Sequence, residues 1–240
     1  MNFAQTSMLG KRECNEDSII SLEKFDKSLF VVADGLGGHD KGEVASAIAT
    51  ETFKELFEND TVDADAFLSE AMTAAQNNIL REQKTQHAAH EMKTTCAALL
   101  IANDVCLFGH IGDSRVYVFQ NNKVKLRTYD HSVSQMLVMS GEIKEKQIRS
   151  HKDRNRLLRV MGIEWDSPKF ELSEKMNLHE CQAFLLCTDG LWEFCDEKKM
   201  CACLKKSADA AQWLKFMVDE VERNGRDKNM DNYSAIAVVR

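Results

Sequence analysis

The stretches VVADGL, residues 31–36, and LLCTDGL, residues 185–191, each run from a short apolar segment into Asp-Gly-Leu. Both apolar segments predict buried strands, so each Asp-Gly pair places a carboxylate where a strand ends. The glycine lets the backbone approach a ligand closely. A single Asp-Gly pair is usually an ordinary turn, but its repetition after two apolar strands favours a site built at strand ends.

Other acidic residues lie in similar surroundings. Glu16 and Asp17 come just before the apolar pair Ile19-Ile20. Asp113 joins two expected strands, and Asp231 precedes the last one. Carboxylates that meet at strand ends repel one another unless a cation neutralises them. All-oxygen ligands suit Mg2+ or Mn2+, and two such ions can activate a bridging water and hold a phosphoryl group. The alternative is that these acids are solvated turn residues that never meet, and the residues alone leave both interpretations open.

The remaining segments alternate short apolar runs with longer runs of helical periodicity. Strands are expected over residues 29–33, 94–102, 105–110, 115–120, 123–128, 183–187 and 234–239. Helices are expected over residues 43–56, 64–82, 196–206 and 208–223, with a short helix between Ser132 and Gly141. Asn103-Asp104 and Asn121-Asn122 mark turns between successive strands. Strands and hairpins outnumber what one helix-covered parallel sheet needs, so mixed layers of antiparallel strands and helices are expected.

The composition is that of a globular domain. The chain has 240 residues, of which 44% are apolar and 29% charged, and its net charge is -7. These values allow a large core and argue against a general nucleic-acid binder, which normally carries a basic face. One proline, Pro168, and the lack of a linker or repeat predict a single domain over residues 1–240.

Neither a membrane segment nor a disulfide framework is expected. No apolar run approaches the ~18 residues that span a bilayer, and the N-terminus lacks an apolar signal core. The chain has eight cysteines but no Cys-x-x-Cys pair, and several of them lie in apolar runs. A free thiol in such a run behaves as a small hydrophobic group. The pattern therefore favours a reducing, cytoplasmic location.

A series of short motifs runs from residue 12 to residue 239. They are Arg12-x-x-Asn15-Glu16-Asp17, VADGLGGHDKGEVAS (32–46), Thr94-Thr95, GDSRVY (112–117), YDHS (129–132), RVMG (159–162), LLCTDGLWE (185–193) and DNYSAIAVV (231–239). The ordered set resembles the PPM-type, or type 2C, metal-dependent serine/threonine protein phosphatases, and bacterial members more than animal ones. The resemblance implies an α+β fold, a four-layer α-β-β-α sandwich with two central antiparallel sheets.

The resemblance also implies a metal-binding role for most of the strand-end acids. Asp34 resembles the carboxylate that bridges two metal ions, Mn2+ or Mg2+, and the carbonyl of Gly35 also binds metal. Asp189 and Asp231 resemble the other direct ligands. Asp113 resembles a ligand for a weaker third ion.

Further matching residues surround these ligands. Glu16 and Asp17 resemble groups that hold metal-bound waters, and Asn232 supports the site through hydrogen bonds. Arg12 resembles the arginine that holds the phosphate, a role that suits a planar guanidinium. His39 is a candidate general acid, although it has an equal claim to a role in shaping its loop.

The function implied is hydrolysis of phosphoserine and phosphothreonine in proteins. A hydroxide bridging the two ions would attack phosphorus in line with the leaving oxygen, and Arg12 and the ions would neutralise the phosphoryl oxygens. A metal-bound water or His39 would protonate the leaving group. The resemblance also implies that residues 132–165 form a mobile flap beside the site, and the polar middle of this segment and its lack of a strong core pattern suit that role.

The expected partners are a phosphorylated protein and a serine/threonine kinase acting in opposition, without nucleic acid or membrane, and the expected state is a monomer. Two other functions stay open. A pseudophosphatase would bind partners without turnover, although intact acids at every matched position argue against it. A phosphatase for small phospho-metabolites would be indifferent to the peptide around the phosphate.

Overall fold

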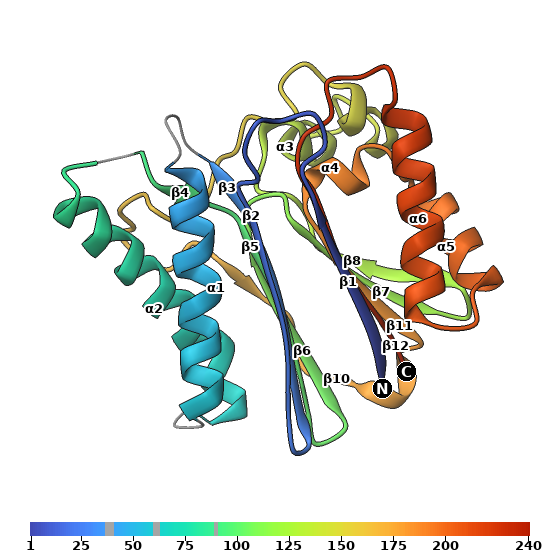
Figure 1. Cartoon of the computed structure of the whole chain (residues 1–240), viewed down its shortest axis with the longest axis horizontal. Coiled ribbons are helices and arrows are strands. Elements are labelled where there is room, and N and C mark those ends of the chain that lie inside the picture. Colours follow the sequence, from blue (N-terminus) through green and yellow to red (C-terminus); the bar gives the residue numbers. More distant parts are fainter. Residues whose placement is uncertain (37–40, 60–62, 89–90) are drawn as a thin grey trace.

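The computed structural model describes residues 1–36, 41–59, 63–88 and 91–240. Two antiparallel sheets lie face to face, and helices cover the outer face of each (Figure 1). This arrangement is the predicted α-β-β-α sandwich. Among the described residues, no helix combines the length and the apolar character that crossing a membrane requires.

The two sheets are here called sheet A and sheet B. Sheet A has five strands in the order β1 (Asn2–Met8), β12 (Tyr233–Val239), β11 (Ala183–Cys187), β7 (Arg115–Gln120) and β8 (Lys123–Arg127). Sheet B runs in the order β10 (Met176–Asn177), β6 (Val105–Ile111), β5 (Cys96–Ala102), β3 (Lys27–Leu36) and β2 (Asp17–Lys24). Two short strands extend sheet B: β4 (Lys93–Thr94) pairs with β3, and β9 (Glu171–Leu172) pairs with β6.

Each sheet carries its own pair of long helices. Helices α1 (Gly42–Asn59) and α2 (Ala64–Thr85) pack on sheet B, whereas α5 (Glu197–Lys206) and α6 (Ala210–Gly225) pack on sheet A. The shorter helices are α3 (Val133–Met139), α4 (Asp189–Trp192) and the 3-10 helices η1 (Glu145–Ser150) and η2 (Leu178–Glu180).

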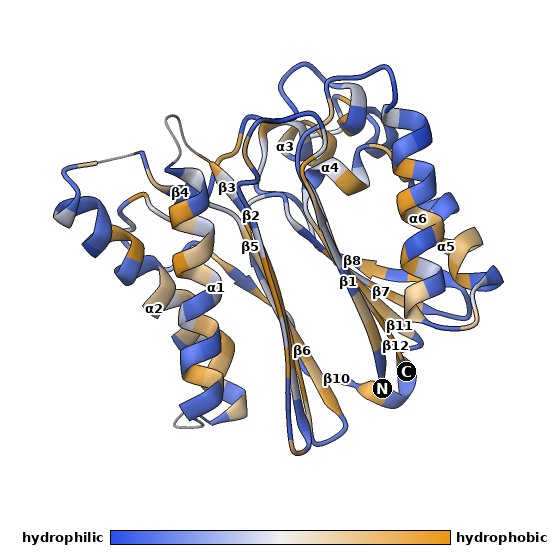
Figure 2. Ribbon diagram, viewed as in Figure 1, coloured by the Kyte–Doolittle hydropathy of each residue, from blue (hydrophilic) through white to orange (hydrophobic). Residues whose placement is uncertain are grey.

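The alternation of side chains along β3 explains the layered core. Leu29 and Val31 point to the core beneath α1 and α2, and Phe30 and Val32 point to the core between the two sheets. All four are fully buried. A strand that is buried on both faces is a continuous apolar run, and Figure 2 shows this hydrophobic character through the strands of both sheets.

The expected helices and hairpins are confirmed, and their ends differ by a few residues. Both asparagine turns have positive φ at their two central residues, between 50° and 59°, which is the geometry of a type I′ hairpin. Strand β3 was expected to stop before Asp34, but it continues to Leu36. Asp34 pairs with Asp17 of β2, and the last two residues pair with β4. The segment after Thr188 was expected only as the end of a strand, and it forms the short helix α4.

Strand β1 was not predicted at all. Its sequence, NFAQTSM, has few apolar residues, so it carries a weak strand pattern. It is ordered by β12, with Asn2 opposite Val239 and Met8 opposite Tyr233. The two ends of the chain therefore pair directly, a contact that local periodicity cannot reveal.

An ion pair is enclosed between β7 and the loop that leads to α3. Arg115 donates Nε and Nη2 to the two carboxylate oxygens of Asp130, at 2.7 and 2.6 Å, and both side chains are about 1% exposed. Arg115 also donates to the hydroxyl of Tyr117 at 3.0 Å. Since a charge without a counter-charge is costly in such surroundings, each partner depends on the other.

Replacing Asp130 with asparagine should therefore lower the free energy of unfolding by about 3–5 kcal/mol, because the buried Arg115 guanidinium would keep only Glu197, 3.9 Å from its Nη1, as a counter-charge. Urea unfolding of metal-free protein measures the change. The matched control is Glu180→Gln, which breaks the more exposed Lys125–Glu180 pair at 3.0 Å and should cost at most about 1 kcal/mol. If both variants lose the same free energy of unfolding, the claim that Arg115 and Asp130 depend on each other is wrong.

Candidate active site

A cleft of about 610 Å³ opens where the two sheets end. Its lining comes from the loop after β1, the end of β3, the turn after β6, the segment after η1, the start of α4, and the loop before β12. The residues that line it are Lys11, Arg12, Glu13, Cys14, Glu16, Asp34, Gly35, Leu36, Asp113, Asn155, Leu157, Asp189, Asn229, Asp231 and Asn232. Segments from both ends and the middle of the sequence thus meet in one acidic cleft.

Asp34 and Asp17 lie opposite each other on neighbouring strands of sheet B. The backbone of Asp34 is fixed by two threonines: its N–H donates to Oγ1 of Thr95 at 3.0 Å, and its carbonyl accepts from Oγ1 of Thr94 at 2.9 Å. Oδ2 of Asp17 accepts a hydrogen bond from Oγ1 of Thr188, at 2.9 Å. Because Thr188 directly follows β11 of sheet A and donates its N–H to the carbonyl of Ser234 in β12 at 3.0 Å, the bond to Asp17 ties the two sheets together beneath the cleft.

Gly35 occupies a position that only glycine can fill. A Cβ there would lie 2.3 Å from the carbonyl oxygen of Gly42 and 2.6 Å from the carbonyl oxygen of Glu16. The N–H of Gly35 donates to that Glu16 carbonyl at 3.1 Å. The absence of a side chain therefore brings the start of α1 and the Glu16 loop against the Asp34 backbone.

Asp189 and Asp113 are buried acids on the other side of the cleft. Asp189 is the first residue of α4, and Asp113 lies in the turn between β6 and β7. Oδ1 of Asp189 is buried and accepts no hydrogen bond from the described residues, and the same holds for Oδ1 of Asp17. Buried carboxylate oxygens without a donor call for a cation or water.

Burial and mutual repulsion raise the pKa values of these acids. Burial first, and then neighbouring charges, raise the pKa of Asp17 and of Asp113 to about 7. The pKa of Asp34 and of Asp189 is also raised well above its ordinary value, by burial and then by the surrounding aspartates. Four buried acids with raised pKa values form a site that lacks the positive charge needed to balance their carboxylates.

Asp231 lies at the rim and is partly neutralised by the chain itself. Its Oδ2 accepts a hydrogen bond from Nη2 of Arg12 at 2.6 Å. The next residue, Asn232, accepts from the N–H of Glu16 and donates to the carbonyls of Leu9 and Cys14, each at 2.9 Å. Asn232 thus clamps the loop that carries Arg12 and Glu16 onto the start of β12.

The donor set fits hard divalent cations. Carboxylate and carbonyl oxygens surround the cleft, as Mg2+ and Mn2+ prefer. Two of the buried carboxylate oxygens accept no hydrogen bond from the described residues, and the acids repel one another until positive charge is supplied. A site of this kind is suited to holding cations and, through them, an anionic group such as a phosphate.

Comparison with known proteins agrees with this geometry. Residues 4–233 match the family model described as protein phosphatase 2C. The chain belongs to the protein phosphatase 2C family. The resemblance that the motifs indicated is confirmed, and with it the assignment of the chain to a family of metal-dependent enzymes.

Individual relatives of this 2C-family chain are bacterial phosphatases. The serine/threonine phosphatase stp of Listeria innocua is 28% identical over 236 residues, which cover 95% of this chain and 91% of that protein. The crystal structure of Stp1 from Staphylococcus aureus has a TM-score of 0.86 and 25% identity, over 100% of this chain and 95% of that chain. The catalytic domain of PstP, solved in complex with 2 manganese ions, has a TM-score of 0.81 and 25% identity, over 99% of this chain and 96% of that chain.

The structure of the 2C-family chain brings most of the predicted site residues together. Those that line the cleft are Arg12, Glu16, Asp34, Gly35, Asp113, Asp189, Asp231 and Asn232. Asp17 lies opposite Asp34 in the neighbouring strand. His39 lies outside the described residues, so its part in the reaction stays a prediction.

Sequence reasoning missed the residues that hold the acids in place. Thr188 was quoted only as part of a motif, and Thr95 only as part of a pair. Two residues of the expected flap, Asn155 and Leu157, line the cleft and were not singled out. The available signal for Thr188 was its place directly before Asp189, whereas Thr95 has no aspartate beside it in the sequence.

A second polar cluster lies away from this cleft. His110, His131 and Glu171 place one possible ligand atom each within 4.8 Å of one another. However, Nδ1 of His131 accepts the N–H of Gly112 at 3.2 Å, so the ring proton lies on Nε2, 3.1 Å from Oε1 of Glu171. A metal on Nε2 would then require an anionic imidazole, which disfavours a metal site here.

The two histidines are better understood as a stacked pair within the fold. Their ring centroids lie 4.6 Å apart, and Nε2 of His110 is 2.7 Å from the carbonyl oxygen of Tyr129. Burial lowers the pKa of both rings, that of His131 to about 4. Both are therefore neutral at pH 7.

Asp189→Asn should raise the stability of the metal-free protein by on the order of 1 kcal/mol, because it removes a buried charge that faces other carboxylates. The same change should greatly reduce the rise in melting temperature that Mn2+ produces, because an anionic ligand is lost. Thermal unfolding with chelator and with Mn2+ measures both effects. A matched control is Asp209→Asn, at the N-cap of α6. A variant that loses metal-free stability and still gains fully from Mn2+ would refute the assignment.

Proposed function

We propose that this protein is a metal-dependent phosphatase that hydrolyses phosphoserine and phosphothreonine in other proteins. The observation that carries the proposal is the convergence of buried, mutually repelling carboxylates in a single cleft. Membership of the protein phosphatase 2C family supports it. So does similarity to the L. innocua phosphatase and to the manganese-bound PstP domain.

The acids would divide the metal-binding work. Asp34, with the carbonyl of Gly35, would hold two core ions together with Asp189 and Asp231. Asp113 would contribute to a weaker third ion. Glu16 and Asp17 would hold water around the ions. When bound, Mn2+ or Mg2+ supplies the Lewis acidity that polarises the phosphoryl group and lowers the pKa of the attacking water.

Arg12 would orient the phosphate at the mouth of the cleft. Its guanidinium has five N–H donors in one plane, and Nη2 already contacts Asp231. The position beside a proposed metal ligand places its remaining donors where they can reach a phosphoryl oxygen. A planar fork is suited to this because it bonds two oxygens in a fixed geometry.

The leaving oxygen must receive a proton, and we propose water in the cleft or His39 as its source. The segment 132–165, which contains α3 and η1, would act as a flap, since its residues Asn155 and Leu157 line the cleft. A substrate protein would contact these residues beside its phosphorylated side chain. The single domain is proposed to act as a monomer, in opposition to a serine/threonine kinase.

The proposed location is the cytoplasm. All eight cysteines are free thiols, and five of them are buried, which fits a reducing compartment. Two alternatives are less well supported. A pseudophosphatase would not need every acid of the cleft. A phosphatase for small metabolites fits less well with relatives that are named serine/threonine phosphatases.

Activity on a phosphothreonine peptide should require added Mn2+ or Mg2+ and disappear in excess chelator, because the acids then repel both one another and the phosphate. The measurement is phosphate release after dialysis, with each metal added back in turn. A free phospho-sugar at the same concentration serves as the comparison substrate. Full turnover in chelator would refute the metal mechanism, and equal rates on both substrates would favour the metabolite alternative.

Arg12→Ala should reduce kcat/KM, chiefly through a raised KM, because a hydrogen bond to the charged phosphate is lost. The expected loss of transition-state stabilisation is on the order of 2–3 kcal/mol. Arg12→Lys should recover only part of this loss, since lysine restores the charge but not the planar fork. Steady-state kinetics at saturating Mn2+ separates the two parameters. The control is Lys24→Ala, which removes a cation that is not part of the cleft lining and donates to the carbonyl of Glu58. If Arg12→Ala matches wild type in kcat/KM, Arg12 has no part in holding phosphate.

A further inference from the structure

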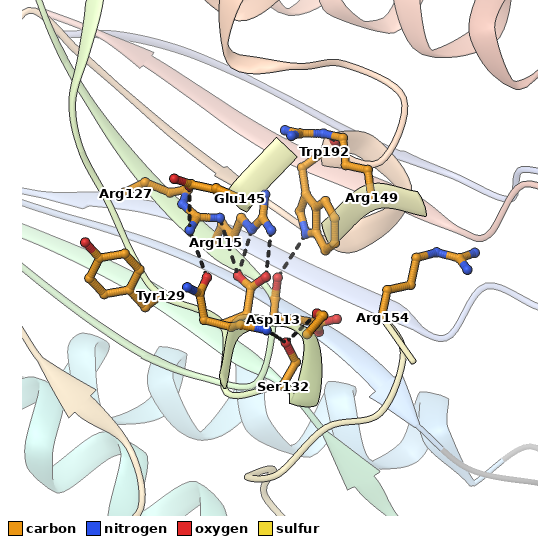
Figure 3. A network of polar contacts seen from close by, with 12 residues as sticks. Asp113, Arg115, Arg127, Tyr129, Ser132, Glu145, Arg149, Arg154 and Trp192 are labelled. Carbon is orange, nitrogen blue, oxygen red and sulfur yellow. Dashed lines mark hydrogen bonds and ion pairs between the residues drawn. The ribbon is translucent and has the colours of Figure 1, made fainter. Parts of the chain in front are cut away.

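The loop after α3 is fastened to the helix that begins with Asp189 (Figure 3). Arg149, in η1, donates Nε to the backbone carbonyl of Trp192 at 2.8 Å and Nη2 to Oε1 of Glu197 at 2.8 Å. Trp192 is the last residue of α4, where the final carbonyls have no partner within the helix. Arg149 therefore caps the C-terminal end of α4 from a different part of the chain.

Trp192 in turn holds the backbone of Asp113. Its indole Nε1 donates to the carbonyl oxygen of Asp113 at 2.9 Å, and its side chain is fully buried. The guanidinium carbon of Arg115 lies 3.6 Å from the centre of the Trp192 ring. The Asp130 carboxylate fixes Arg115 in place through two hydrogen bonds. The contact with Arg115 thus fixes one face of the indole. The hydrogen bond from the indole then fixes the position of the Asp113 carbonyl.

On the opposite side of this chain of contacts, η1 is anchored at both ends. Its first residue, Glu145, pairs with Arg127 of β8 at 2.8 Å. Ile148 is buried in the core of sheet A. Arg149 then reaches α4. The helix η1 therefore spans from the edge of sheet A to the element that carries Asp189.

We infer that Arg149 is a positioning residue of the cleft: by capping α4 at Trp192 it fixes the indole that holds Asp113, and so tunes the affinity of the Asp113 metal site. The inference rests on the proposed role of Asp113. Arg149 itself is not among the residues that line the cleft. Its effect therefore passes through Trp192.

The chemistry of Arg149 suits this role. It makes two hydrogen bonds from one planar group to acceptors on two helices, α4 and α5. Burial by itself would raise the pKa of Glu197, but the charge of Arg149 and its hydrogen bond lower that pKa below its ordinary value. The pair is therefore ionised at neutral pH. A lysine at this position would keep the charge and could reach one acceptor at a time.

The experiment compares Mn2+ binding to wild type, Arg149→Met, Arg149→Lys and Asp113→Ala. Free Mn2+ is followed by its electron paramagnetic resonance signal, so binding is measured without turnover. The matched control is Lys146→Met, which removes an exposed cation from the same helix η1. Phosphatase kinetics at limiting and at excess Mn2+ are measured in parallel.

Asp113→Ala should lose the weakest bound ion, and Arg149→Met should bind that ion about tenfold more weakly, as expected when a supporting contact of a ligand is removed. Binding of the tighter ions should not change. The kcat of Arg149→Met should fall at limiting Mn2+ and recover at excess Mn2+, whereas that of Asp113→Ala should not recover. Arg149→Lys should lie between wild type and Arg149→Met, and Lys146→Met should match wild type.

Three results would overturn the inference, and they are distinguishable. If Asp113→Ala loses the weak ion but Arg149→Met binds it like wild type, Arg149 has no positioning role and the proposed function stands. If Asp113→Ala binds every ion like wild type, the proposed role of Asp113 is wrong, and the inference falls with it. Uniform weakening of all ions in Arg149→Met would also overturn it, because that result indicates general destabilisation.

Discussion

Repulsion between carboxylates is the constraint that shapes the cleft. Asp17, Asp34, Asp113 and Asp189 come from different strand ends, and burial together with their neighbours' charges raises the pKa of each. Without a cation, a flexible chain would separate these groups or leave them protonated. The metal-free fold holds them together, so the rest of the structure must supply the stability that the cleft lacks. A site under this strain binds divalent cations strongly because binding relieves the repulsion.

The sandwich holds the acids of the cleft in place in two ways. The three apolar layers fix both sheets, so the strand ends cannot move apart. Short polar contacts then fix each acid locally. Thr188, directly after β11 of sheet A, donates a hydrogen bond to Asp17 of sheet B, and Asn232 clamps the loop that carries Arg12. The pairing of β1 with β12 brings that loop to the cleft in the first place.

The sequence predicted the helices, the hairpins and the acids of the cleft, because each depends on local pattern or on a short motif. It did not predict β1, whose order comes from a partner more than two hundred residues away. The strand end at Asp34 was also placed too early, since cross-strand pairing with Asp17 extends β3. The threonines that anchor the acids were missed because a hydroxyl beside an aspartate has no periodic signal. These errors share one cause, which is that the deciding contact joins distant segments.

The motifs contain residues other than the proposed metal ligands, and in the structure these residues make contacts that hold the cleft in place. Ser114 is no nucleophile: its hydroxyl lies 2.7 Å from that of Thr95, which in turn binds the backbone of Asp34. In the YDHS motif, His131 donates its backbone N–H to the carbonyl of Gly112 at 2.8 Å and accepts the Gly112 N–H on its ring. Asp130 of the same motif holds Arg115, on which Trp192 rests. The turn that presents Asp113 is therefore fixed from both sides, by one motif at its backbone and by another through an indole. The order of the motifs along the chain carries information because their non-acidic residues contact one another in the fold.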